Sequence, residues 1–336
     1  MDFIVSAELD STVSLTPCSE QRVQAHLLPR VYQQRPHGRR KEVRGELRRS
    51  IAHSRHRYWA RSYLGYPPVR HAHANETHVA IARLQKEGLL HQLITQNVDR
   101  LHHVASYDLG EHHPNILELH GSLSEVCCVQ KGPKHEEAQH WVRTHRNSPH
   151  AWWNPSETEA FGPMDRFRPV QVEAHESPGC GLWIARDAMQ DHLSTLNPKW
   201  EEWAKRLETD PSLRLRRNPD GDIQLEGVNY SEFKYPPCPC CGGVLKPDVV
   251  FFGEGVRASV RKAAEEAVHQ CDALLIVGTT LATHSAYRLA KDASQAGKPV
   301  ILVNRGPTRA DEIIDTRVGL SCSEVMSSVA TEVLGS

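Results

Sequence analysis

The sequence predicts an α/β protein in which a parallel sheet carries helices and is joined to a smaller, metal-binding domain. Three observations favour this fold class. A strand–helix–strand unit fills residues 273–303, a second strand with a polar turn at its carboxyl end fills residues 92–99, and closely spaced cysteines occur at 127–128 and 238–241. The chain has 336 residues, which is enough for one large domain or two ordinary ones.

Composition excludes several classes of function. Lys and Arg number 40 against 41 Asp and Glu, so a net charge of −1 gives no reason to expect attraction for nucleic acid or anionic lipid. The arginines between Arg35 and Arg61 are interpreted as a solvated face. No run of 18 apolar residues occurs, which predicts no membrane span. The acidic N-terminus, without Arg before Arg22, is a poor secretory or transit peptide. Nine cysteines, an odd number, favour metal ligation in a reducing compartment over disulfides.

The strand–helix–strand unit has the strongest pattern. Residues 273–277 are a continuous apolar run, which is typical of a parallel strand buried on both faces. An apolar helical face begins at Ala286, and residues 300–303 form the second strand. Such a unit binds its ligand at the carboxyl ends of its strands, here residues 278–280 and Asn304.

Weaker patterns precede and follow this unit. Residues 77–88 predict a helix and residues 92–95 a strand, and an alternating segment, residues 115–122, leads to His120. Residues 323–334 predict a closing helix with one apolar side formed by Val325, Val329 and Val333. Residues 197–208 have a helical pattern, whereas residues 1–45 show only weak strand signals.

Five motifs carry a resemblance to a known family. TQNVDRLH, ELHGS, CPCCGGVLKPDVVFFGE, IVGTTL and VNRGPT, in this order, resemble those of the sirtuins, which are NAD-dependent protein deacylases. RYWARSYLGYPP, LNPKW and NPDGD are most similar to the mitochondrial class II branch, whose members act on several acyl groups or transfer ADP-ribose. The resemblance covers residues 52–128 and 180–334.

The resemblance implies a division of the chain. Its Rossmann-like NAD-binding domain would comprise residues 52–126 and 246–336, and its zinc-binding small domain residues 127–245. Residues 1–51 form an atypical N-terminal segment, and residues 131–179 an irregular insertion of about 49 residues in the zinc region. Two explanations of the insertion stay open. It is either a surface loop, because closing a longer loop costs little free energy, or a translated intron.

The resemblance also implies one structural zinc ion held by four thiolates. Cys238 and Cys241 form a C-x-x-C pair, yet Lys131 stands three residues after Cys128. In the class II branch the second zinc cysteine precedes a glycine and, some twenty residues later, an Asn-Pro-x-Trp sequence; Cys180 has both features. The implied ligands are therefore Cys128, Cys180, Cys238 and Cys241, whereas Cys127 and Cys240 stand at the wrong spacing.

The implied catalytic residues are His120, Asn97 and Asp99. His120 would relay a proton from the nicotinamide ribose hydroxyls after the acyl oxygen of the substrate has displaced nicotinamide. Without the motif, His120 would be interpreted as a structural histidine and residues 96–99 as a polar turn. The implied NAD-binding residues are Gln96, Asn97, Asp99, Gly278, Thr279, Thr280, Asn304, Arg305, Gly306 and Cys322.

The implied partner is an acylated lysine of a protein substrate, whose peptide would add as a strand along residues 249–254. One departure bears on activity. Sirtuins begin with a strand and a Gly-Ala-Gly-Ile-Ser phosphate loop, and this sequence has no such loop before Arg57. Either the gene model is defective, or the chain as given has lost its first central strand and binds NAD poorly.

Several functions stay open on the sequence alone. The first is NAD-dependent protein deacylation, which releases nicotinamide and transfers the acyl group to ADP-ribose. The alternatives are protein ADP-ribosylation at the same NAD site and a catalytically impaired, zinc-stabilised module that binds acylated peptide. A zinc-ribbon nucleic-acid protein is disfavoured by the balanced charge. Branch resemblance predicts a mitochondrial location, with cytoplasm or nucleus as alternatives.

Overall fold

The structure is a computed structural model that describes residues 2–5, 40–129, 140, 144, 179–180, 182–209 and 229–335. Side chains are described from residue 55 onward within these ranges, apart from residues 207–209. Most of the predicted insertion at residues 131–179 lies outside the described residues, as does the NPDGD turn at residues 218–222.

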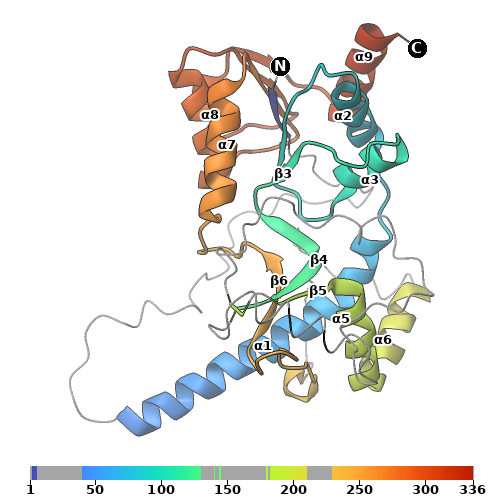
Figure 1. The fold of residues 1–336 in the computed structure, drawn as a ribbon, viewed down its shortest axis with the longest axis vertical. Helices are drawn as coiled ribbons and strands as arrows, with labels where there is room; N and C mark the ends of the chain where they lie inside the picture. Colours follow the sequence, from blue (N-terminus) through green and yellow to red (C-terminus); the bar gives the residue numbers. More distant parts are fainter. Residues whose placement is uncertain are drawn as a thin grey trace.

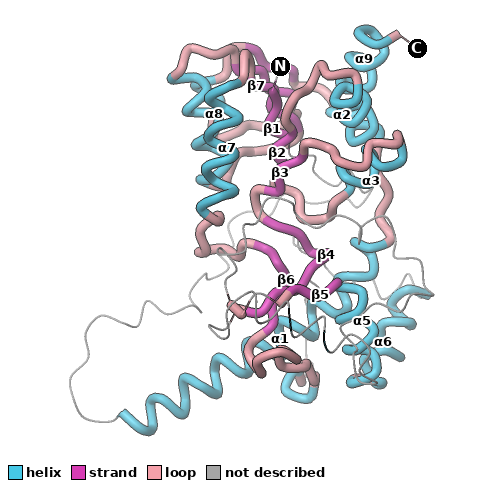
Figure 2. Tube along the Cα trace, in the orientation of Figure 1, coloured by secondary structure: helices cyan, strands magenta, loops and turns pink. Residues whose placement is uncertain are grey.

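A six-stranded parallel sheet forms the centre of the larger part of the molecule (Figure 2). Its strands, in spatial order, are β3 (Ile116–Glu118), β2 (Leu93–Thr95), β1 (Asp2–Val5), β7 (Leu274–Val277), β8 (Val300–Val303) and β9 (Thr316–Val318). The chain moves outward in one direction from β1 to β3 and in the other from β7 to β9, so the connections reverse between β1 and β7. Doubly wound dinucleotide-binding sheets have this order. The predicted α/β fold with a parallel sheet is confirmed.

The central position of β1 corrects the expectation that the first central strand is lost. Phe3 lies in register with Leu93 of β2 on one side and with Leu275 of β7 on the other. Four residues form this strand because its backbone groups are satisfied by neighbours on both edges, a long-range contribution that a local sequence pattern does not contain. Residues 6–39, where the phosphate loop of the family would lie, are outside the described part of the chain.

Helices cover both faces of the parallel sheet (Figure 1). Helices α7 (Ala258–Gln270) and α8 (His284–Gln295) pack with Ile94 and Ile276 on one face. Helices α2 (Glu76–Lys86) and α9 (Cys322–Leu334) pack with Leu93, Val277 and Val303 on the other. Helix α3 (Leu101–Asp108) lies beside α2, and a short 3₁₀ turn, η5 (Asp311–Ile313), precedes β9. Neighbouring strand residues thus face opposite layers, which explains the continuous apolar runs of β7 and β8.

Helix α9 confirms the predicted closing helix and part of its predicted apolar side, because Val325 packs against the core. Met326 and Ala330 are buried against α2 and the sheet, whereas Val333 is 57% exposed and Val329 is 39% exposed. A spacing of four residues advances the side chain by more than a full helical turn, so an i, i+4, i+8 series drifts off the buried face. The buried face of α9 is therefore formed by Met326 and Ala330, with Val325 beside them.

The smaller part of the molecule is built on an antiparallel sheet with the strand order β5 (Trp183–Ala185), β4 (Gly121–Cys128), β6 (Leu245–Val249). Helices α1 (Arg40–Arg70), α5 (Arg186–Leu196) and α6 (Pro198–Thr209) and the turn η4 (Tyr230–Glu232) surround it. Helix α6 confirms the helix predicted over residues 197–208. Trp59 and Tyr63 of α1 pack in this core beside the buried cysteines, although the predicted boundary assigns residues 52–126 to the NAD-binding domain. The domain boundaries themselves stay a prediction.

Helix α1 continues through Pro67 and Pro68, which a sequence pattern would place at a helix end. Pro67 has no N–H to bond the carbonyl of Tyr63, four residues earlier. Gln190 Nε2 donates to that carbonyl at 2.9 Å from helix α5, so a tertiary contact replaces the missing helical bond. Although α1 is long, no described helix has both the length and the apolar character required to cross a bilayer.

Three neighbouring histidines, two of them buried and one half-buried, predict that the fold is sensitive to acid. The rings of His78 on α2 and His102 on α3 lie 4.5 Å apart, and His103 adjoins them. Burial lowers the pKa of His78 to about 4 and that of His103 to about 3, and lowers the pKa of His102 well below its ordinary value of 6.5. Unfolding lets each ring take up a proton at higher pH. The free energy of unfolding should therefore decrease as the pH falls below 6.5, by about 2 kcal/mol per such histidine at pH 5. Asp99 offsets part of this loss, because burial raises its pKa to about 6.

The variant His102→Leu tests this prediction. Neither ring nitrogen of His102 has a hydrogen-bond partner among the described residues, so leucine forfeits no such bond and removes one titrating group. We expect urea denaturation to give the variant a higher midpoint than the unmodified protein at pH 5.5 and a smaller difference at pH 7.5. The matched control is His113→Gln at an exposed position, which should leave the pH dependence unchanged. Equal pH dependence in all three proteins would contradict the prediction.

Candidate functional site

Polar residues meet at the carboxyl edge of the parallel sheet. Gln96 directly follows β2, Gly278 follows β7 and Asn304 follows β8, while His120 stands two residues after β3. Since these strands are parallel, all four residues lie at one edge, and the connections reverse between β1 and β7 at this same edge. Ligands of doubly wound α/β proteins bind at such a switch point.

Side chains from the two halves of the sheet are hydrogen-bonded across this edge. Gln96 Nε2 donates to Thr279 Oγ1 at 3.0 Å, and Thr283 Oγ1 donates to Gln96 Oε1 at 2.8 Å. Thr279 is buried, whereas Thr280 is exposed. Gly278 has a φ of 63°, a conformation that glycine adopts without strain. Thr283 was not a predicted site residue, because it stands outside the Gly-Thr-Thr motif.

His120 is held from several sides. Its Nε2 lies 2.9 Å from Ser285 Oγ, and its backbone carbonyl accepts a hydrogen bond from the Val250 amide at 2.8 Å. The next residue, Gly121, has a φ of 78°, and a Cβ there would collide with the Asp248 carbonyl of β6. The glycine of the His-Gly motif is therefore required by the close approach of β4 and β6. Burial lowers the pKa of His120, so its ring is neutral near pH 7.

The turn after β2 directs Asp99 into the interior. Asp99 Oδ1 accepts from the Leu101 amide at 3.0 Å, and burial raises the pKa of this carboxyl to about 6. Arg100 follows with a φ of 63°, which is rare for a residue with a side chain. Its buried guanidinium forms ion pairs with Glu118 of β3 at 3.2 Å and with Glu125 of β4 at 3.5 Å. These ion pairs tie the turn to the two strands that flank His120. Asn97 is anchored in the same turn, because its backbone N–H donates to Thr95 Oγ1 at 3.1 Å.

The predicted adenosine side of the site lies beyond β8. Asn304 is buried, and its Nδ2 donates to the Gly306 carbonyl at 2.8 Å, which closes the turn around the exposed Arg305. Cys322, the first residue of α9, has its thiol 3.5 Å from the Val303 carbonyl. The structure thus places these residues beside one another at the strand end. Amide, hydroxyl and carbonyl groups of this kind fit a dinucleotide, and the role of each residue in NAD binding stays a prediction.

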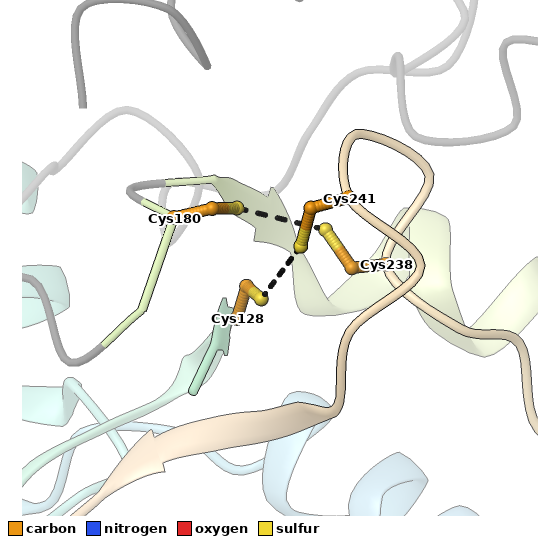
Figure 3. A group of neighbouring side chains, drawn as sticks. All are labelled: Cys128, Cys180, Cys238 and Cys241. Atoms are coloured by element: carbon orange, nitrogen blue, oxygen red, sulfur yellow. Dashed lines mark hydrogen bonds between the residues drawn. The ribbon is translucent and has the colours of Figure 1, made fainter. Parts of the chain in front are cut away.

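The four predicted zinc ligands come together in the smaller part of the molecule. The sulfur atoms of Cys128, Cys180, Cys238 and Cys241 all lie within 4.8 Å of one another, and Figure 3 shows them pointing toward a common centre. Two of the sulfur pairs, Cys128–Cys241 and Cys180–Cys238, are 3.6 and 3.7 Å apart. A tetrahedral zinc with Zn–S bonds of about 2.3 Å places its sulfurs about 3.8 Å apart. The donor set and its dimensions therefore fit zinc.

The ionisation of these thiols supports the same fit. Hydrogen bonding to Cys128 raises the pKa of Cys238 to about 12 and raises the pKa of Cys180 far above its ordinary value, and burial adds to both shifts because it penalises a thiolate. A divalent cation at the centre would remove this penalty and release the protons. Cys127 faces away from the cluster: its thiol donates to Asp248, and burial raises its pKa to about 12. Cys127 and Cys240 are outside the group, as their spacing predicted.

The predicted peptide-binding strand continues from β6, which is an edge strand of the antiparallel sheet. Just beyond it, Phe252 is 85% exposed. The neighbouring Phe251 packs against Tyr58, and Lys246 pairs with Glu254 at 2.5 Å across the turn. Within the described part of the chain the outer edge of β6 pairs with no strand. Such an edge, followed by an exposed aromatic side chain, is compatible with addition of a peptide strand.

Sequence comparison identifies relatives of this chain. An NAD-dependent protein deacylase of Batrachochytrium dendrobatidis is 36% identical over 83% of this chain and 75% of its own length. An NAD-dependent protein deacylase of Arabidopsis thaliana is 33% identical over 82% of this chain and 61% of its own length. An NAD-dependent protein deacetylase of Bradyrhizobium diazoefficiens is 34% identical over 83% of this chain and 78% of its own length.

Structural comparison supports the fold. A solved complex of a mutant Sir2 homologue with ADP-ribose superposes with a TM-score of 0.50 at 21% identity, over 85% of this chain and 77% of the other. The family model described as the Sir2 family matches residues 32–285, which is most of the chain. The chain therefore belongs to the Sir2 family.

Proposed function

We propose that this protein is an NAD-dependent protein acyl-lysine deacylase, which releases nicotinamide and transfers the acyl group to ADP-ribose. The observation that carries the proposal is the meeting of His120 and Gln96 with Thr279 at the switch point of a Sir2-family sheet. Relatives that match more than four fifths of the chain are NAD-dependent deacylases or deacetylases.

NAD, when bound, supplies the ribose carbon from which nicotinamide departs and the hydroxyls that receive the acyl group. The protein's own contribution begins with His120, whose neutral ring takes a proton at the ribose hydroxyls. Its lowered pKa supports this role, because a base must be unprotonated at the working pH. Gln96, Asn97 and Asp99 bind the ribose, a water molecule and the carboxamide around it.

The remaining parts hold the reactants. The turn of Gly278, Thr279 and Thr280 binds phosphate, and Asn304, Arg305, Gly306 and Cys322 form the adenosine side. An acylated lysine peptide adds along residues 249–254, which positions the acyl group toward His120. Zinc at the four cysteines is structural, since four thiolates leave no open position for water.

The test is turnover of purified, zinc-quantified protein with NAD and an acyl-lysine peptide, accompanied by calorimetric titration with NAD. We expect equimolar nicotinamide and acyl-ADP-ribose, with weakened NAD affinity because no Gly-Ala-Gly phosphate loop precedes Arg57. Radiolabel from NAD on protein without acyl-ADP-ribose would favour ADP-ribosylation instead. No NAD binding by a folded, zinc-loaded chain would favour a peptide-binding module.

Class II membership and a mitochondrial location belong to the same proposal. They are supported by RYWARSYLGYPP and LNPKW, which resemble that branch. A panel of peptides with different acyl chains and fractionation of cells expressing the protein test them. Exclusive cytoplasmic or nuclear recovery would contradict the location.

A further inference from the structure

We propose that Ser285 is a positioning residue for His120. Its hydroxyl donates to Nε2 when no cofactor is bound, which fixes the ring and keeps Nε2 unprotonated, and this bond is exchanged for the ribose hydroxyl whose proton Nε2 then takes. The inference rests on the proposed function, because the proton in question is that of the deacylation reaction. Ser285 stands seven residues after Gly278, outside the motif that predicted the NAD site.

The contact is short and comes from a rigid element. Ser285 is the second residue of helix α8, and its Oγ lies 2.9 Å from His120 Nε2. Ala286 next to it is fully buried in the core between α8 and the sheet. A helix start anchored in this way restricts where the hydroxyl can lie, and so restricts the imidazole ring.

A second hydrogen bond of the His120 ring indicates which ring nitrogen accepts a hydrogen bond from Ser285. His120 also makes a hydrogen bond with the Gln96 backbone that raises its pKa. A bond that stabilises the protonated ring is one in which the ring donates, so the ring N–H faces the Gln96 carbonyl. A neutral imidazole has a single N–H, which leaves Nε2 to accept from the Ser285 hydroxyl. Ser285 therefore favours the tautomer that a general base needs.

These contacts form one network with the predicted cofactor turn. Gln96 accepts from Thr283, at the start of α8, and donates to Thr279 in the turn before it. The Gln96 backbone bonds His120, and Ser285 of the same helix bonds the other side of the ring. A ligand that moves the turn or the start of α8 would thereby reorient His120.

The variants Ser285→Ala and Ser285→Thr test the proposal, with Ser294→Ala near the other end of α8 as the matched control. We expect Ser285→Ala to lower kcat about tenfold with little change in KM for the acyl-peptide, since ring orientation and not substrate binding is altered. The acid limb of its pH profile should move to higher pH, because a donor that favours the neutral ring has been removed. Ser285→Thr, which keeps the hydroxyl, should restore most of kcat.

A measurement without turnover separates this proposal from the proposed function. Proton–nitrogen correlation spectra of histidine-labelled, NAD-free protein report the tautomer and pKa of His120, whose resonance is identified by its loss in His120→Ala. Ser285→Ala should raise that pKa and reduce the tautomer preference, whether or not the protein deacylates peptides. An unchanged titration of His120 would overturn the proposal, as would an equal loss of kcat in Ser294→Ala.

Discussion

Replacing Cys238 with serine is expected to release zinc and unfold the smaller part of the molecule. Cys238 is 1% exposed, and its sulfur lies 3.7 Å from that of Cys180. Zinc binding by structural sites contributes about 10–16 kcal/mol in zinc-finger peptides, which is as large as the whole stability of a typical domain, about 5–15 kcal/mol. The zinc content should fall from close to one ion per chain to a small fraction of this, and thermal unfolding should begin at a much lower temperature.

The neighbouring cysteine provides the control for this experiment. Cys240→Ser changes the same atom two residues away, outside the group of four, and should retain zinc. Because β4 both ends at Cys128 and begins one residue after His120, loss of zinc in Cys238→Ser should also impair turnover. Full zinc content in Cys238→Ser, or equal loss in Cys240→Ser, would exclude the assigned ligand set.

Replacing His120 with alanine is expected to lower kcat by about 10²- to 10⁴-fold, the range typical of a lost general base. The fold should be unaffected, because the His120 side chain is only partly buried and its backbone bond to Val250 does not depend on the ring. Discontinuous assays of nicotinamide release measure turnover, and calorimetry with NAD measures cofactor affinity separately. Retained NAD affinity with lost turnover would identify His120 as the base rather than as a binding residue.

The pH profile gives a second readout of the same residue. Burial lowers the pKa of His120, so activity should be lost only as the pH falls below the ordinary histidine value of 6.5. The exposed His113→Ala serves as the control and should retain both kcat and the pH profile. A His120→Ala protein with a wild-type rate would require another base.

Much of the fold could be predicted because its signals are local. The buried strands β7 and β8 were predicted from apolar runs and helix α8 from helical spacing. The observed ends of the two strands differ from the predicted ends by at most one residue. Strand β1 could not be predicted, since its four residues are fixed by pairing with β2 and β7. Helix α1 was missed: residues 1–45 showed only weak strand signals, which is wrong for residues 40–45 because α1 begins at Arg40. Its last turn was missed because Pro67 argues for a helix end, and the compensating bond comes from Gln190, far away in the sequence.

Some residues of the candidate site could likewise be predicted from the sequence, and others could not. The four cysteines could be chosen because zinc ligands follow fixed spacing, and a Gly and an Asn-Pro-x-Trp sequence identified Cys180 despite the insertion. Thr283 and Ser285 were missed because their importance depends on where helix α8 begins relative to β2 and β3. A sequence pattern predicts helix α8. The contacts of Thr283 and Ser285 depend on how the strands are aligned in the whole sheet, which the pattern does not contain.

The central position of β1 has a consequence for biosynthesis. Ribosomes make Asp2–Val5 before the other described strands of the sheet, and its partner in β2 follows after fewer than a hundred residues. The other partner, around Leu275, emerges only when most of the chain has been synthesised. Until then β1 and β2 present an open edge, and such edges pair readily with other chains. A central strand of the sheet is thus made earlier than the other described strands and is among the last to be paired on both sides. The yield of native protein should therefore depend on how long the nascent chain is protected from aggregation.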